Sequence, residues 1–125
     1  MELKYDKWEF YNGNEEHSGV CYKWTLHEDG EQFGTIRYEI IPTACIVHVY
    51  PTAGITKSKL NKLRETNDAL MEFILMDQWN FEEVYYVTPN DFLVRFLSRN
   101  TYDEVGEVED MPIYMSNLKE VLCHL

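Results

Sequence analysis

The sequence predicts a single domain of the α/β (α+β) class spanning residues 1–125, in which strands, a helix, a strand, a helix and final strands follow one another. Aromatic and β-branched runs fill the first 50 residues. From Thr56 the apolar side chains return at three- and four-residue intervals, as on one face of a helix. With 45% hydrophobic and 14% aromatic residues, the chain can bury one core, and no second domain fits.

The first third of the sequence predicts four strands. Turn dipeptides separate them, as at Asn12-Gly13 and Asp29-Gly30, and the second of these favours a hairpin. The fourth run, ACIVHVY, is almost continuously apolar, which is typical of a strand buried at the centre of a sheet. The expected strands are residues 3–11, 20–26, 32–40 and 44–50.

The rest of the chain predicts two helices with strands around them. An amphipathic helix is expected over residues 58–78, capped by Thr56 or Ser58. A strand over residues 82–88 follows, and then Pro89-Asn90 opens a second helix that ends at Asn100. This helix is expected to turn Phe92, Leu93, Phe96 and Leu97 inward.

The C-terminal region predicts a strand pair over residues 105–108 and 113–115 around a corner at Asp110-Met111-Pro112. The last ten residues predict one or two helical turns.

Composition restricts the classes of function. The chain has 22 acidic and 11 basic residues, a formal net charge of -11, which disfavours direct binding to nucleic acid. No apolar run approaches the length of a membrane span, and the first ten residues do not resemble a signal peptide. Cys21, Cys45 and Cys123 show no C-x-x-C spacing, which fits free thiols in a reducing compartment. We therefore expect a cytoplasmic protein with no membrane contact.

The acidic residues occur in groups, which leaves two interpretations open. They form a solubilising surface, or they form a surface complementary to a basic protein. The clusters nearest to each other in sequence flank the expected final strand pair and are the first choice for such a contact. These candidate partner-binding residues are Asp103, Glu104, Glu107, Glu109 and Asp110.

Residues 90–106, NDFLVRFLSRNTYDEVG, carry a resemblance to a known family. The segment resembles the closing pattern of the GNAT acetyltransferase superfamily, roughly N-x-x-A-x-x-L-Y-x-K-L-G-F-x-x-V-G. Asn90 falls on the Asn of the family, Tyr102 on its aromatic residue, and Val105-Gly106 on its final V-G. The general-acid Tyr is replaced by Leu97 and the Gly by Thr101. The resemblance covers roughly residues 32–116.

The resemblance implies a GNAT-like mixed, mainly antiparallel, twisted sheet with two main helices. Family members place two further helices after the first strand, where they cover the acceptor site. Residues 11–17, YNGNEEH, are too few and too rich in Asn and Gly to form them. These N-terminal helices are therefore expected to be reduced or absent.

The resemblance also locates a cofactor site. In the superfamily, the pyrophosphate of acetyl-CoA lies on backbone N–H groups in a Gly-rich loop before the helix that follows the fourth strand. Val49 and Pro51 keep the family's V-x-P opening, but of the loop glycines only Gly54 remains. We therefore expect no cofactor. If acetyl-CoA does bind, the implied residues are Val49, Gly54, Ile55, Thr56, Lys57 and Asn90.

Acyl transfer needs a base for the amine and an acid for the thiolate of CoA. Leu97 supplies no proton. The weak catalytic candidates are Glu39, His48 and Tyr86, although His48 equally fits a hydrogen-bonded core histidine. The four histidines lack metal-ligand spacing, so no metal is expected.

Two hypotheses about function remain. The first is a GNAT-fold protein with an eroded acetyl-CoA site, a non-catalytic protein-binding or virion accessory factor. Compact GNAT-related proteins of tailed phages are similar in size and acidity, and a viral protein of this type would act in the host cytoplasm or virion. The alternative is an active acetyl-CoA-dependent N-acetyltransferase with an atypical pyrophosphate loop.

Overall fold

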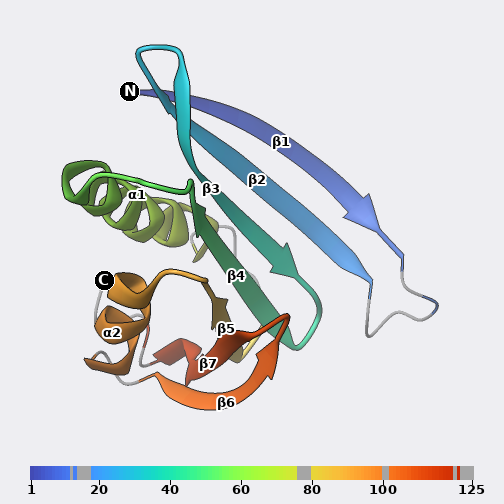
Figure 1. Ribbon diagram of the computed structural model, residues 1–125. Coiled ribbons are helices and arrows are strands. Elements are labelled where there is room, and N and C mark those ends of the chain that lie inside the picture. Colours follow the sequence, from blue (N-terminus) through green and yellow to red (C-terminus); the bar gives the residue numbers. More distant parts are fainter. Residues whose placement is uncertain (12, 14–17, 76–79, 100–101, 120, 122–125) are drawn as a thin grey trace.

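A computed structural model describes the chain except for residues 12, 14–17, 76–79, 100–101, 120 and 122–125, and it leaves the side chains of 96–99 undescribed. Figure 1 shows its helices and strands. The strands are β1 (Glu2–Phe10), β2 (Gly19–Glu28), β3 (Glu31–Ile40), β4 (Ala44–Pro51), β5 (Glu83–Val87), β6 (Asp103–Val108) and β7 (Met111–Asn117). The helices are α1 (Lys57–Leu75) and α2 (Asp91–Arg99).

The strands form one seven-stranded sheet in the order β1-β2-β3-β4-β5-β7-β6. Neighbouring strands are antiparallel except β4 and β5, which are parallel because α1 carries the chain back between them. This confirms the predicted mixed, mainly antiparallel sheet with two main helices. β1 pairs with β2 from Glu2↔His27 to Phe10↔Gly19, so the chain passes from one to the other as a hairpin.

Both helices lie on the same face of the sheet (Figure 1). Residues that alternate along the strands toward this face are buried, as Tyr38 and Val47 are at the centre. Leu63 and Ile74 of α1 and Leu93 of α2 pack on them. We call this side of the sheet the helix face, and the other side the bare face, because it carries no helix in the described part of the chain.

Most element boundaries agree with the sequence prediction to within one to three residues. Thr56 caps α1, since its Oγ1 accepts from the Lys59 N–H at 3.3 Å. Asp29 and Gly30 form the expected turn between β2 and β3, with φ of 53° and 82°. The predicted end of the first helix, residues 76–78, lies outside the described residues, as do Cys123 and the side chains of Phe96 and Leu97.

The corner before the last strand was placed wrongly from the sequence. The turn lies at Glu109 and Asp110, and Val108 pairs with Met111 directly across it. Pro112 is inside β7, beyond the last β7–β5 pair at Ile113, so its missing N–H costs no hydrogen bond to β5. Proline therefore marks the end of a pairing here and not the turn itself.

No described helix is long and apolar enough to span a membrane. Cys21 and Cys45 are buried free thiols, and burial raises their pKa to about 11 and about 12. Both are therefore inert core residues, as predicted for Cys45.

Candidate functional site

The parallel strands β4 and β5 separate at their carboxyl ends. Their last pair is His48↔Val87, and β4 continues through Val49, Tyr50 and Pro51, which are paired with β3 but not with β5. The chain then turns into α1. Of the residues implied by the resemblance, Val49 is fully buried in the core, while Gly54, Ile55, Thr56 and Lys57 follow in the loop and the helix start.

The loop between β4 and α1 uses part of its own backbone to fold. The Thr52 N–H donates to Phe33 O at 3.1 Å, and the Ile55 N–H donates to Thr52 O at 3.3 Å. Gly54 has a φ of 73°, so residues 52–55 form a turn that needs a glycine at its third position. The two N–H groups are therefore not available to a ligand.

The start of α1 retains features of an anion site. Within the described residues, the N–H groups of Lys57 and Ser58 have no acceptor, as is usual in a first helical turn. This first turn contains no Asp or Glu, although acidic side chains are favoured near the positive end of a helix dipole. Farther along, Lys62 pairs with Glu28 at 2.7 Å. Lys57 is thus placed to meet an anion, whereas Lys62 is already neutralised.

A chain of polar side chains crosses the bare face on β3 and β4. His48 Nε2 lies 3.0 Å from Glu39 Oε1, and Arg37 Nη2 lies 3.0 Å from the same oxygen. On its other side, His48 Nδ1 lies 2.9 Å from the Tyr50 hydroxyl. The interaction with His48, supported by Arg37, holds the pKa of Glu39 below its ordinary range despite partial burial. The structure therefore brings the two predicted bases together and adds Arg37 and Tyr50, which sequence reasoning missed.

Two atoms of these polar side chains are buried without a well-aligned hydrogen bond inside the described part of the protein. They are Nε of Arg37 and Nε2 of His48, whose contact with Glu39 has the distance of an ion pair but not the angle of a hydrogen bond. Next to them, Trp8, Phe10 and Cys21 complete a hollow of about 230 Å³ with Arg37 and Glu39. Successive side chains of a strand point to opposite faces, and this puts Arg37, Glu39, His48 and Tyr50 on one face. The two-residue spacing within each strand is the sequence signal that could have grouped these four residues.

Tyr86, the third catalytic candidate, lies on the helix face. It is 7% exposed, and its hydroxyl is bound by Nδ2 of Asn67 on α1. The Tyr38 hydroxyl donates to Oδ1 of the same Asn67 at 2.5 Å. Burial raises the pKa of both tyrosines well above the ordinary value. The sheet therefore separates Tyr86 from Glu39 and His48, and its hydroxyl holds α1 on the sheet.

Asn90, the last residue implied by the resemblance, caps a helix. Its Oδ1 accepts from the N–H groups of Phe92 at 3.0 Å and Leu93 at 3.1 Å. This satisfies two N–H groups at the start of α2.

The five candidate partner-binding residues lie on and beside β6, the edge strand at one end of the sheet. Every residue of β6 is exposed, and the hairpin tip at Glu109 and Asp110 is exposed too. Residues 102–117 contain no Lys or Arg. Burial raises the pKa of the Tyr50 hydroxyl, Arg37 opposes this, and the charge of Glu109 at the tip adds to it.

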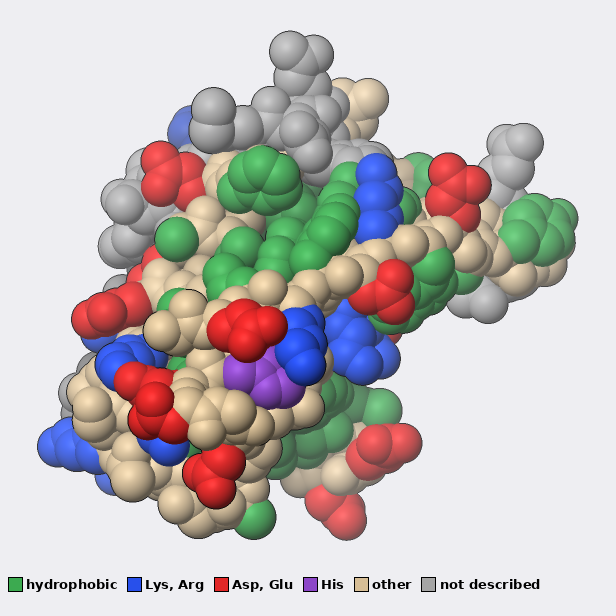
Figure 2. All heavy atoms as spheres, turned by 90° about the horizontal axis from the view of Figure 1, so that it is seen from above, with side chains coloured by type: hydrophobic (Ala, Val, Ile, Leu, Met, Phe, Trp, Pro, Cys, Tyr) green, Lys and Arg blue, Asp and Glu red, His purple; other side chains and the backbone are tan. Residues whose placement is uncertain are grey.

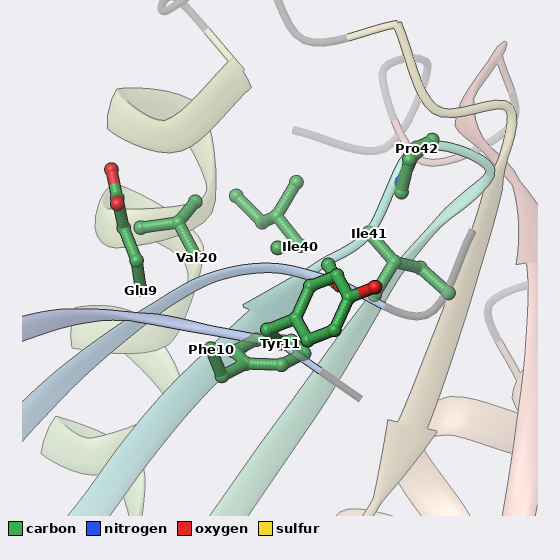
Figure 3. A pocket seen from close by; sticks show the side chains of 9 residues that line it. Glu9, Phe10, Tyr11, Val20, Ile40, Ile41 and Pro42 are labelled. Carbon is green, nitrogen blue, oxygen red and sulfur yellow. The ribbon is translucent and has the colours of Figure 1, made fainter. Parts of the chain in front are cut away.

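A larger hollow, of about 660 Å³, lies at the other end of the strands. Phe10 and Tyr11 of the β1 end face Ile40, Ile41 and Pro42 of the β3–β4 turn (Figure 3). The walls are mostly apolar, and among the described residues that line them Glu9 is the one carboxylate. Within the described residues, no group of three His, Cys, Asp or Glu side chains is placed to hold a metal ion.

Comparison with solved structures shows a GNAT-like fold. The N-terminal domain of a ribosomal-protein-alanine acetyltransferase from Clostridium acetobutylicum matches 91% of this chain and 92% of its own, with a TM-score of 0.54 and 13% identity. An acyl-CoA N-acyltransferase from Pseudomonas aeruginosa matches 79% of this chain and 68% of its own, with a TM-score of 0.54 and 17% identity.

The PaiA N-acetyltransferase from Thermoplasma acidophilum, solved with coenzyme A, has a TM-score of 0.53 at 15% identity. The match covers 78% of this chain but 60% of the Thermoplasma protein. The sequence itself matches no family model, and no curated protein matches it either.

Proposed function

We propose that this GNAT-like protein acts by binding a basic protein through the acidic edge formed by β6 and the β6–β7 turn. The observation that carries the proposal is the exposure of this edge. Its five carboxylates and the side chains of Val105 and Val108, 50% and 42% exposed, face solvent together on a strand with one unpaired side. Such an edge offers apolar contact and negative charge to one partner.

The turn itself supports a role for the charge. Glu109 and Asp110 have φ of 49° and 64°, values that Gly and Asn adopt with least strain. A residue held in such a conformation costs on the order of 1 kcal/mol or more. A tip built for stability alone would carry Asn-Gly, so the two carboxylates fit a binding role better than a structural one.

The cofactor loop supports binding over catalysis. The superfamily pattern relies on backbone N–H groups of this loop, and here those of Thr52 and Ile55 are bonded within the protein. In the described part of the chain, the bare face also lacks the helices that would enclose an acceptor. Of the eight large hydrophobic residues that are exposed among those the structure describes, seven lie on or beside the two edge strands β1 and β6.

The test reverses charge at the edge and compares it with the same change elsewhere. Glu107→Lys with Glu109→Lys is expected to slow association with a lysine-rich peptide about tenfold at low salt, because exposed charges steer encounter. Glu65→Lys with Glu72→Lys, on the exposed side of α1, changes the net charge equally. Stopped-flow fluorescence measures the rates, and capture from the native source identifies basic proteins lost with the edge variant. Equal effects of the two variants would show that only net charge matters and would refute the proposal.

The second candidate function is acyl transfer, and the polar chain on the bare face favours it. The Glu39 carboxylate lines the adjoining hollow and is placed to accept a proton from an amine there, with His48 Nε2 3.0 Å from it. The Tyr50 hydroxyl, 2.9 Å from His48, belongs to the part of β4 that extends past the last pair with β5 and could serve as the proton donor. Acetyl-CoA would supply the acyl group and would lie on the N–H groups of Lys57 and Ser58 beside Gly54.

A further inference from the structure

Strand β1 forms the other edge of the sheet and lacks several of the features that usually keep an edge from pairing. Bulges, prolines, short lengths and charged side chains, lysine above all, are the common devices, and of these β1 has the charged side chains alone. β1 has nine residues, no proline, no glycine and an unbroken register with β2. The opposite edge strand β6 differs, because its register shifts between Glu104 and Gly106. The β1 edge is therefore open to another strand.

The side chains of β1 add apolar surface to this open edge. Leu3 and Tyr5 are 42% and 54% exposed on the helix face, and Trp8 is 38% exposed on the bare face. The Tyr5 ring centroid lies 5.0 Å from that of Trp24, which meets Phe73 of α1 at 6.4 Å. Figure 2 shows hydrophobic side chains gathered in a band between charged ones on one face of the molecule. An added strand would extend the cover over this surface.

The backbone of β1 turns N–H and C=O groups to the free edge, and the Asp6 carboxylate already binds one of them. The Lys7 N–H donates to Oδ1 of Asp6 at 2.9 Å, which is expected of an N–H that faces the free edge and not β2. Because this direction alternates along a strand, Leu3 and Tyr5 turn their N–H and C=O groups to the same edge. The Asp6 carboxylate thus occupies a donor that a further strand would use.

We propose that this edge pairs with β1 of a second copy of the chain, antiparallel, about a two-fold axis at Tyr5. Directly opposed residues of antiparallel strands point to the same face of the sheet. A two-fold axis perpendicular to the sheet must therefore pass between a residue and the same residue of the second copy. Centring on Lys4, Asp6 or Lys7 would oppose like charges on the axis. Centring on Tyr5 opposes two tyrosine rings.

This register makes the rest of the edge complementary. Lys4 lies opposite Asp6 of the second copy, and the two-fold axis repeats the pair. Leu3 lies opposite the aliphatic stem of Lys7. Opposite charges in such positions stabilise a sheet, whereas like charges destabilise it. The five charges of β1, three acidic and two basic, sum to -1 in a chain of net charge -11, so this edge suits self-association better than the rest of the surface.

Three other registers avoid like charges on the axis, those centred on Leu3, Trp8 and Phe10, and all are shorter. Within β1 they pair residues 2–4, residues 6–10 and residue 10 alone, whereas centring on Tyr5 pairs residues 2–8. The longer register forms more backbone hydrogen bonds, which favours Tyr5.

Sedimentation equilibrium tests the dimer. We expect a molar mass approaching twice 14.9 kDa at tens of micromolar. Lys4→Glu is expected to weaken dimerisation about tenfold or more, because it turns two attractions into two repulsions. The charge swap Lys4→Glu with Asp6→Lys should restore it, and Lys119→Glu, which changes the net charge equally at an exposed site, should leave it unchanged. Thermal unfolding verifies that each variant is folded. A monomer at every concentration, or no recovery in a folded charge swap, overturns the proposal.

Cysteine cross-linking tests the register. Tyr5→Cys brings two cysteines within the 4.4–6.8 Å between Cα atoms that a disulfide needs, since opposed residues lie about 4.5–5.5 Å apart. Lys7→Cys, opposite Leu3, should not cross-link. Rapid oxidation of Tyr5→Cys alone to a covalent dimer supports the register. Cross-linking of Trp8→Cys in its place overturns it.

Discussion

Replacing Asn67 with Ala tests the contact that fixes α1 on the helix face. The Asn67 side chain is 3% exposed and binds two buried hydroxyl groups, those of Tyr38 and Tyr86. Tyr38 also donates to the backbone oxygen of residue 67 at 3.1 Å, and alanine keeps that acceptor. The substitution therefore isolates the Tyr86 hydroxyl but leaves Tyr38 with one partner.

The expected destabilisation follows from this asymmetry. A buried polar group left without a partner costs about 1–3 kcal/mol, and the lost side-chain volume adds a smaller amount. Asn67→Ala should thus lower the free energy of unfolding by about 2–4 kcal/mol. Adding Tyr86→Phe removes the isolated hydroxyl and should recover about 1 kcal/mol or more, whereas adding Tyr38→Phe should recover little.

Urea unfolding followed by circular dichroism and tryptophan fluorescence measures these differences. Trp24 reports on the site because its ring contacts Tyr38 at 5.8 Å. Unchanged m-values show that stability, and not the extent of unfolding, has changed. A loss below about 1 kcal/mol, or equal recovery by the two Phe variants, would refute the placement of the amide between the hydroxyls.

Two further predictions concern the cofactor loop and the bare face. Acetyl-CoA should bind with a dissociation constant no better than about 1 mM by calorimetry, because two loop N–H groups are already bonded; a micromolar constant that Gly54→Val abolishes would favour the transferase. The lowered pKa of Glu39 predicts stability that is present above its ordinary pKa of 4.5 and is lost as the pH falls through the lower folded value. The free energy of unfolding should therefore fall less steeply with decreasing pH for Glu39→Gln than for the parent. Identical slopes would show that the contact with His48 contributes nothing.

The sequence by itself determined the elements and their order. The apolar run ACIVHVY predicted a buried central strand, and β4 holds that position in the sheet. The periodicity of apolar side chains and the positions of turn residues are local properties, so they can be recognised from the sequence without knowledge of the fold. The pattern after Asn90 added the GNAT-like arrangement, which the solved structures confirm. The failure was not local: Pro112 was read as part of a turn, but its position inside β7 depends on where β5, a strand distant in the sequence, ends.

The tertiary structure decided which candidate residues meet. Glu39 and His48 were chosen from the sequence as separate bases, and the pairing of β3 with β4 places them 3.0 Å apart and adds Arg37. The same sheet separates Tyr86 from them, because adjacent strand residues alternate faces and only the packing of α1 shows which face is covered.

The exposure of the two edges was equally beyond the sequence. Leu3 and Tyr5 of β1 have the pattern of a strand with one buried side, yet no helix covers them enough to exclude solvent. Burial is set by what packs on a residue from elsewhere in the chain, and Phe73 of α1 meets Trp24 of β2 beside this edge but is itself exposed. Local sequence therefore specifies that a strand forms, whereas its neighbours in space decide whether its apolar side chains become core or a surface for another protein.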